Sequence, residues 1–234
     1  MFRKIIKFTL FCILFLTFMC YFQRITDIAG ITDKTILQTV NGDLQGFCSK
    51  RNVGVVYAIL VLLGFNYFHE DNVNMIVKYK NRNNYFNKII LKQIIMVSFI
   101  VAFIHGTINL IYNYMFIKNS ILESSNIVIK NYTNSLLLSL FYVSVLLIFL
   151  SLSNYMKNNT SMFLMIIALG VTYYFQEDSN IKVLPQNYIS NIPRFIESDN
   201  WIRVAIFSLI PLLSYCIIFY FISKSIYDKK EYIK

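Results

Sequence analysis

Charged residues and flexible residues are both scarce in this chain of 234 residues. Charged side chains make up 15% of it, against roughly 25% in ordinary soluble domains, whereas 56% of its residues are hydrophobic. This balance is typical of a membrane protein. Only 7 Gly and 3 Pro occur, and no low-complexity linker or internal repeat divides the sequence. We therefore expect one folding unit covering residues 1–234.

Two motifs that carry chemistry are also missing. No GxxxxGK[ST] loop occurs and no Gly is followed by Lys, so the chain has no P-loop with which to hydrolyse a nucleotide. The four cysteines, Cys12, Cys20, Cys48 and Cys216, show no CxxC or CxxxH spacing, which argues against a zinc site and a disulfide framework. We expect these cysteines to serve packing, and the chain itself to bind no metal and no cofactor.

Two classes of membrane hydrolase are disfavoured by the supply of His, Glu and Cys. A prenyl endopeptidase would need paired glutamates and two histidines within spans, but the chain has no Glu-Glu pair and only His69 and His105. A cysteine protease that matures signalling peptides would need a Cys and a His together near the inner membrane face. His69 is expected there, but no cysteine lies near it in the sequence. We therefore predict that the chain is not an enzyme and has no catalytic residue.

Long apolar runs are abundant, and they set the predicted architecture. A helix that crosses a bilayer needs about 20 mainly apolar residues. Six runs fit or approach that length, at residues 5–22, 53–68, 93–116, 135–153, 161–175 and 203–222. The second and fifth are short. The first follows Arg3, Lys4 and Lys7 as a signal peptide would, but the sequence after it lacks a small-x-small cleavage site, so we predict a membrane helix.

Six spans place both termini on one side of the membrane. Lys and Arg are denser on that side, so the positive-inside rule favours cytoplasmic termini. The first cytoplasmic loop then contains the basic run "KYKNRNNYFNKIILKQ", residues 78–93. Attraction to anionic headgroups, about 1 kcal/mol per basic residue, explains the charge of this loop but not its length.

Helical periodicity offers a reason for the length of the loop. Met75, Ile76 and Tyr79 fall at positions i, i+1 and i+4, which predicts a short amphipathic helix. We expect an Asn-rich break at residues 81–84 and then a second helix that continues into the third span.

These features together resemble a known family. Six spans of this size, with an acidic residue after the second span and a basic run leading into the third, are similar to the permease subunits of ABC-2-type transporters, in particular those of small Gram-positive peptide or bacteriocin export and immunity systems. The architecture covers the whole chain, and the motif covers residues 67–93. The resemblance implies that this segment is the helix that couples the permease to its ATPase, carried here by Glu70, Asp71, Met75, Ile76, Tyr79, Arg82 and Lys88. Asn72 and Asn74 stand where the family often has a Gly.

The resemblance also implies partners and a location. We expect a separate ABC ATPase, in two copies, that binds ATP and Mg, and a second permease that is either identical or related. The substrate is expected to be a peptide or a lipid-like molecule, and the location the bacterial cytoplasmic membrane. No nucleic acid is expected. The family has short re-entrant helices between its fifth and sixth spans, which would fall in residues 176–201.

Polar residues within the predicted spans are further candidates. His105, Asn109 and Asn113 recur every four residues and predict either a wall of the substrate path or the permease dimer interface, with hydrogen bonds between helices as the alternative. Ser135 and Ser139 form a small-xxx-small pair that favours close helix packing. Pro211 predicts a kink in the sixth span, which serves either as a hinge or as a fixed bend.

A second function remains open from the sequence. A membrane protein that confers immunity by binding or blocking a toxin peptide would share the same length, basicity and spans. Such a protein would need no ATPase, so co-purification with one separates the two hypotheses.

Overall fold

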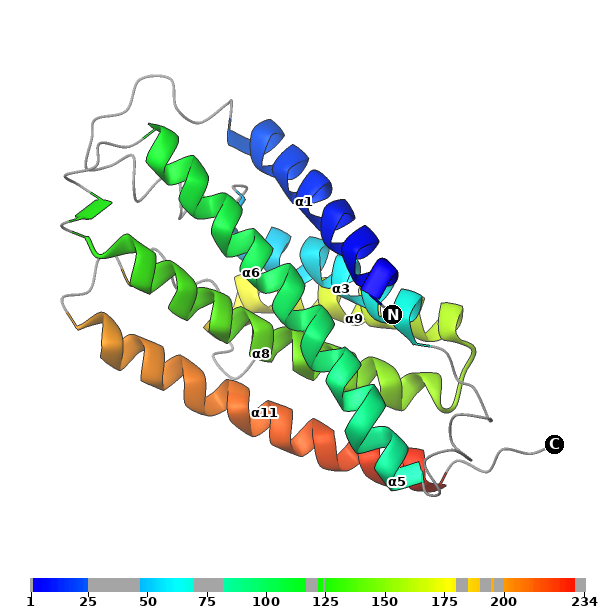
Figure 1. Ribbon diagram of the computed structural model, residues 1–234. Helices are drawn as coiled ribbons and strands as arrows, with labels where there is room; N and C mark the ends of the chain where they lie inside the picture. The colour runs from blue at the N-terminus through cyan, green and yellow to red at the C-terminus, as the bar shows by residue number, and fades with distance from the viewer. Residues whose placement is uncertain are drawn as a thin grey trace.

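Helices form all the regular secondary structure in the described part of the protein. The computed structural model describes residues 2–24, 47–69, 82–116, 122–123, 125–179, 185–189, 195 and 200–229. Within these ranges no strand occurs, which confirms the predicted all-helical class. The helices lie side by side as one bundle (Figure 1).

The helices follow the apolar runs of the sequence, with several extensions. Their bounds are α1 (Phe2–Arg24), η1 (Asn52–Val56), α3 (Tyr57–Phe68), α5 (Arg82–Tyr85), η2 (Phe86–Ile90), α6 (Leu91–Phe116), α8 (Ile127–Ser153), α9 (Asn158–Ser179), η3 (Pro185–Tyr188) and α11 (Trp201–Lys229). Two of them, η1 and η2, are π-helical turns, and η3 is a 3₁₀ turn. Because η1 leads directly into α3, and α5 and η2 lead directly into α6, these elements form two longer continuous helices.

Four helices in the described ranges are long and apolar enough to cross a membrane. They are Phe2–Phe22, Asn83–Met115, Ile127–Ser153 and Trp201–Lys229. A fifth apolar helix, Asn52–Phe68, is shorter and coincides with the short run predicted at 53–68. The other short run, 161–175, lies inside α9, which is long enough but does not meet the same hydropathy criterion. Within the described residues, four such helices are compatible with a multi-pass membrane protein.

The helices that contain the third and fourth predicted spans begin earlier in the structure than the sequence predicts. Residues 82–85 are helical, so the predicted break at residues 81–84 is wrong from Arg82 onward. A side-chain bond from Asn87 Nδ2 to Asn83 Oδ1, 2.9 Å long and one turn apart, stabilises this helical start. Helix α8 begins at Ile127 rather than at 135, because its first two turns bury polar side chains against α6 instead of exposing them.

Helix α8 lies at the centre of the bundle. It contacts α6 on one side and α11 on the other, and it also contacts α3 and α9. In its most apolar stretch 72% of the residues are buried, against 22% in α1 and 17% in α11. Figure 1 shows α1, α6, α8 and α11 in succession. The outer helices therefore expose apolar surface, and α8 does not.

Both ends of the described chain lie toward the same end of the bundle, which we call the terminal end. The start of α1 and the end of α11 lie there (Figure 1). The last turn of α3 joins them, since Phe8 of α1 packs edge-on against Phe68 with the ring centroids 5.5 Å apart. Helices α1, α6 and α9 run away from the terminal end, and α3, α8 and α11 run toward it.

Candidate functional site

The polar stripe predicted on α6 is buried inside the bundle. His105, Asn109 and Asn113 are each at most 1% exposed. Two polar residues of α8, Asn131 and Ser135, are buried as well and lie against the same stretch of α6. We call these five residues the polar seam.

Hydrogen bonds across the polar seam join α6 to α8. Asn109 Nδ2 donates to Asn131 Oδ1 at 2.9 Å, and Asn131 Nδ2 donates to the carbonyl oxygen of Gly106 at 2.9 Å. Asn131 thus uses its whole amide to bind a side chain and a backbone carbonyl of the neighbouring helix. For the stripe of His105, Asn109 and Asn113, the sequence left hydrogen bonds between helices open as the alternative, and Asn109 makes such a bond. The roles of substrate path and dimer interface stay predictions.

Gly106 allows the two helices to approach closely at the polar seam. A Cβ atom at this position would overlap Ser135 Oγ and lie 3.1 Å from Asn131 Nδ2. Ser135 Oγ donates back to the carbonyl of Asn131 at 3.1 Å, which satisfies the hydroxyl within its own helix. The close packing predicted for Ser135 is confirmed, with Gly106 as the partner that the sequence analysis did not identify.

His105 has a sulfur neighbour that the sequence did not reveal. Cys48 Sγ lies 3.9 Å from His105 Nε2, and the imidazole stacks on Phe47 with a centroid separation of 4.6 Å. Tyr57 lies against the same ring and donates its hydroxyl to the carbonyl of Phe47 at 3.1 Å. The sequence analysis searched for a cysteine near His69, but the pair forms at His105, 57 positions away from Cys48.

The burial of Cys48 and His105 determines whether this pair can act on a substrate. Cys48 is 3% exposed and His105 is 1% exposed. A thiolate nucleophile must reach a substrate carbonyl, and burial keeps both side chains from doing so. In this conformation the pair therefore serves as a packed contact between the start of η1 and α6.

The polar seam continues beyond its hydrogen bonds, away from the terminal end. Both amide atoms of Asn113 are buried, and neither has a hydrogen-bond partner among the described residues. Lys130 and Asn134 of α8 are also buried. The sequence analysis missed Lys130 and Asn131 because it began the fourth span at residue 135, after them.

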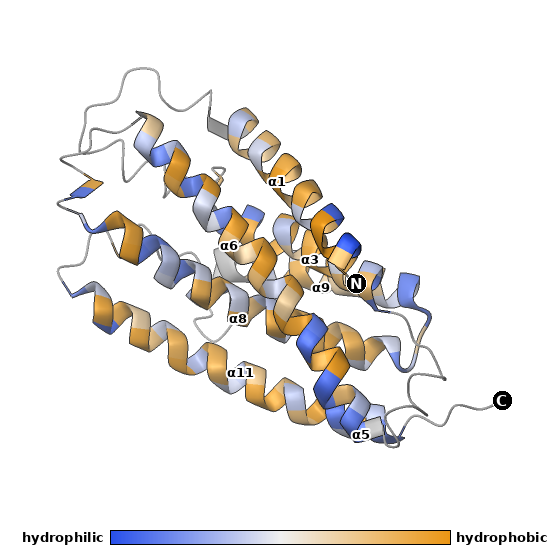
Figure 2. Ribbon diagram, in the orientation of Figure 1, coloured by the Kyte–Doolittle hydropathy of each residue, from blue (hydrophilic) through white to orange (hydrophobic). Residues whose placement is uncertain are grey.

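Only part of the predicted coupling segment lies within the described residues. Glu70, Asp71, Met75, Ile76 and Tyr79 lie outside the described residues. The backbone of Arg82 begins α5, and Lys88 is exposed in η2. Figure 2 shows this start of the long helix as a hydrophilic stretch that leads into the hydrophobic α6.

The start of this long helix is fastened to α11. Tyr220 donates its hydroxyl to Asn87 Oδ1 at 2.9 Å. Phe86 packs against the rings of Tyr220 and Tyr227, with centroids 5.9 Å and 5.4 Å away. Elements far apart in the sequence therefore meet at the terminal end, where they contact each other through polar and aromatic side chains.

Helix α11 is joined to α8 by small polar side chains. Ser151 Oγ lies 2.7 Å from Ser223 Oγ, and Cys216 Sγ lies 3.3 Å from Ser144 Oγ. Pro211 is half-buried within α11, and the helix continues through it. The hinge role of Pro211 stays a prediction.

No group of three or more potential metal ligands occurs in the part of the chain that the structure describes. No protein-family model, curated protein or solved structure matches the chain.

Proposed function

We propose that the chain is the membrane-spanning permease subunit of an ABC exporter. In this proposal it couples ATP hydrolysis by a separate ATPase subunit to the export of an amphipathic or antimicrobial peptide. One observation carries the proposal: the described part of the basic segment, residues 82–93, continues as one helix into α6, which bears three residues of the polar seam. Residues 82–116 are helical throughout, so a displacement at the terminal end moves the seam-bearing face with it.

The contacts of this helix support such a transmission. Asn87 and Phe86 bind α11 through Tyr220, and Asn109 binds α8 through Asn131. A push delivered near Arg82 therefore acts on three helices at once. ATP and Mg bind to the partner ATPase, and this chain supplies the docking surface, the connecting helix and the wall of the path.

The topology that we propose has six spans with both termini in the cytoplasm. It is supported by the alternating direction of α1, α3, α6, α8, α9 and α11, which places the two chain ends at the terminal end. The basic residues Lys88 and Lys92 lie exposed near the same end, as the positive-inside rule requires of a cytoplasmic surface.

A re-entrant element between the last two spans is also part of the proposal. Gln186 of η3 is 1% exposed, and its Nε2 donates to the carbonyl of Leu169 in α9 at 3.1 Å. Its Cγ would lie 3.5 Å from a Cβ placed on Gly54. The side chain of Gln186 is thus inserted among helices, which supports a re-entrant segment here.

Co-purification tests the proposal. The chain is expressed with the ATPase encoded beside its gene and extracted in mild detergent. We expect a stoichiometric complex that the double substitution Glu70→Ala and Arg82→Ala releases, because both residues lie in the proposed docking segment. Lys157→Ala is the matched control, since Lys157 is an exposed basic residue in the turn between α8 and α9. A chain that purifies alone and still protects cells lacking the ATPase would instead be an immunity protein of the stand-alone kind.

A second test addresses coupling rather than binding. Insertion of a Gly-Ser pair between Asn81 and Arg82 adds flexibility immediately before the long helix. We expect the complex to hydrolyse ATP without transport, with membrane insertion intact. The same insertion after Met156, an exposed position in the α8–α9 turn, should leave transport unchanged. Normal transport by the first variant would contradict the coupling role.

A further inference from the structure

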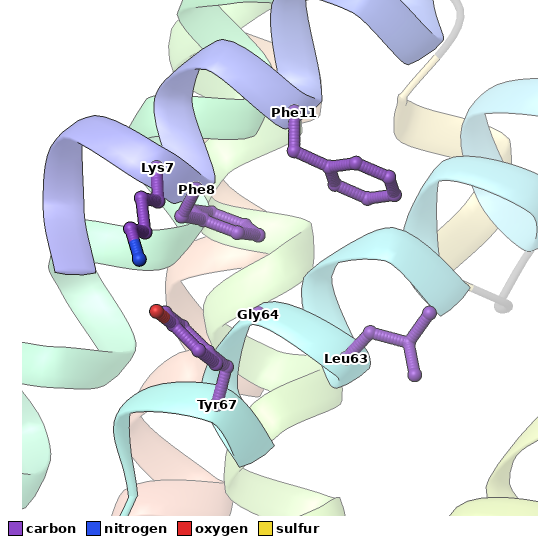
Figure 3. A pocket seen from close by; sticks show the side chains of 6 residues that line it. All are labelled: Lys7, Phe8, Phe11, Leu63, Gly64 and Tyr67. Atoms are coloured by element: carbon purple, nitrogen blue, oxygen red, sulfur yellow. The ribbon is translucent and has the colours of Figure 1, made fainter.

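A cavity opens between α1 and α3 near the terminal end. Its volume is about 310 Å³, at the lower end of the roughly 300–1,000 Å³ that ligand pockets span. Its walls are formed by Lys7, Phe8, Phe11, Leu63, Gly64 and Tyr67, as Figure 3 shows. We call it the α1–α3 groove. None of its lining residues belongs to the polar seam or to the predicted coupling segment.

The floor of the α1–α3 groove is fixed by a glycine. A Cβ on Gly64 would overlap the ring of Phe8, so this ring lies directly on the backbone of α3. The same ring packs edge-on against Phe68, which holds it from a second side. The groove is therefore a built depression between two helices rather than a gap between loosely packed side chains.

The two ends of the groove differ in chemistry. Phe11 and Leu63 are about half exposed and form the apolar end. The ammonium group of Lys7 and the hydroxyl group of Tyr67 lie together at the other end (Figure 3). The Lys4 ammonium lies 5.5 Å from the centre of the Tyr67 ring, which adds a second positive charge. None of the six lining residues is acidic.

This combination matches one class of ligand. An amphiphile with an anionic head and an apolar tail would place its charge between Lys7 and Tyr67 and its tail along Phe11 and Leu63. Basic pockets between membrane helices on the cytoplasmic side bind anionic lipid headgroups, and Tyr is enriched at that interface. We propose that the α1–α3 groove binds one anionic phospholipid, with its phosphate at Lys7 and Tyr67 and one acyl chain against α1 and α3.

The placement in the cytoplasmic leaflet rests on the topology proposed above, but the binding itself does not. The purified chain in detergent has no leaflets, and lipid binding to it needs no ATPase. Failure of the lipid test would therefore leave the transport proposal standing, and loss of ATPase binding would leave the lipid site standing.

Native mass spectrometry of the purified, delipidated chain tests the site with phosphatidylglycerol as the probe and phosphatidylcholine as the comparison. We expect one phosphatidylglycerol to be retained in preference. Lys7→Ala should weaken its binding about fivefold, the effect of removing one basic residue near a lipid surface, and should abolish most of the preference over phosphatidylcholine. Lys157→Ala is the matched control and should change neither value.

A second variant tests the apolar half. Leu63→Trp fills the groove at an exposed position, and it should reduce retention of both lipids while the melting temperature stays the same. Equal effects of Lys7→Ala and Lys157→Ala would overturn the proposal in favour of unspecific boundary lipid. Displacement of the lipid by millimolar inorganic phosphate would overturn it in favour of a free anion site. Disulfide-linked dimers of a Phe11→Cys variant in lipid-free detergent would overturn it in favour of a second copy of the chain.

Discussion

Helices α8 and α11 are both apolar enough to cross a membrane, yet they face different surroundings. In their most apolar stretches 72% of the residues of α8 are buried but only 17% of those of α11. Hydropathy therefore identifies both helices as spans without indicating which of them lies inside the bundle. The polar residues make that distinction.

The buried helix, α8, has polar side chains that contact the neighbouring helices α6 and α11. Asn131 and Ser135 face α6, whereas Ser144 and Ser151 meet α11. Lipid tails are as apolar as Leu, so helices in a bilayer associate through close packing and hydrogen bonds rather than through the hydrophobic effect. The outward side of α11 exposes instead a row of large apolar side chains, Ile206, Phe207, Ile210, Leu213, Ile217 and Phe221. That surface suits lipid or a second permease.

The largest expected difference in stability is between two leucine-to-alanine substitutions, one in α8 and one in α11. Leu146 of α8 is fully buried and Leu213 of α11 is 40% exposed. Leu146→Ala should lower the free energy of unfolding by about 2–5 kcal/mol because it leaves a cavity, and Leu213→Ala should change it by less than about 0.5 kcal/mol. Detergent-induced unfolding in mixed micelles measures both. Equal losses would show that α11 is packed as tightly as α8.

The next contrast uses two glycines. Gly106→Ala should destabilise the bundle by about 1–3 kcal/mol through overpacking against Ser135. Combining it with Ser135→Ala should recover most of the loss, because the overlapping oxygen is removed. Gly170→Ala in α9 is the control. Its added methyl meets nothing within 4 Å, so the greater helix propensity of Ala should stabilise the protein by up to about 1 kcal/mol. If both glycine variants behave alike, the close approach of α6 and α8 is not as described.

Removal of the seam hydrogen bonds should have a smaller effect. Asn131→Leu removes two bonds, which at about 0.6 kcal/mol each amounts to a loss near 1 kcal/mol. A double-mutant cycle between Asn109→Ala and Asn131→Ala should return a coupling energy of about 0.6 kcal/mol. Ser214→Ala on the exposed side of α11 should be neutral. A coupling energy of zero would remove Asn109 and Asn131 as partners.

Tyr220→Phe should have the smallest effect on stability and a clear effect on activity. It removes the bond to Asn87 but keeps the ring against Phe86, so we expect a loss of about 0.6 kcal/mol. Because this contact fastens the proposed coupling helix to α11, ATP-driven transport should fall while ATPase binding is retained. Tyr155→Phe, at an exposed position of the α8–α9 turn, should leave transport unchanged. Full transport by the Tyr220 variant would show that α11 is not driven through this contact.

The parts of the fold that follow from composition could be predicted from the sequence, and the parts that follow from pairing could not. Apolar runs predicted the helices because length and hydropathy act within one segment. The start of α8 was placed too late because Lys130 and Asn131 are polar, and only a partner helix makes their burial possible. The break at residues 81–84 was predicted from the loop preferences of Asn, which the helical bond between Asn83 and Asn87 overrides.

In the candidate site, too, the features set within one helix could be predicted from the sequence and those set by contacts between helices could not. The spacing of His105, Asn109 and Asn113 correctly placed them on one helix face, because helical periodicity is local. Their partners, Cys48 and Asn131, are set by tertiary packing, and no spacing rule connects them to α6. Gly106 falls between His105 and Asn109 in the sequence, and a small residue there is a local signal of a close helix contact, as the pair Ser135 and Ser139 is on α8.

The π-helical turn η2 has a consequence for how insertions and deletions are tolerated. It separates the basic start of the long helix from the polar seam, and it accommodates one more residue per turn than the α-helix around it. Its five residues cover nearly the same rotation and rise as four α-helical residues, so loss of a single residue from Phe86–Ile90 would leave a regular α-helix with everything before it almost unrotated relative to the seam. Loss of a residue from a regular α-helix would instead cause a rotation of about 100°. The proposed docking surface and the polar seam would thus keep their angular phase, so a deletion of one residue should be better tolerated in η2 than in the regular α-helix that follows it.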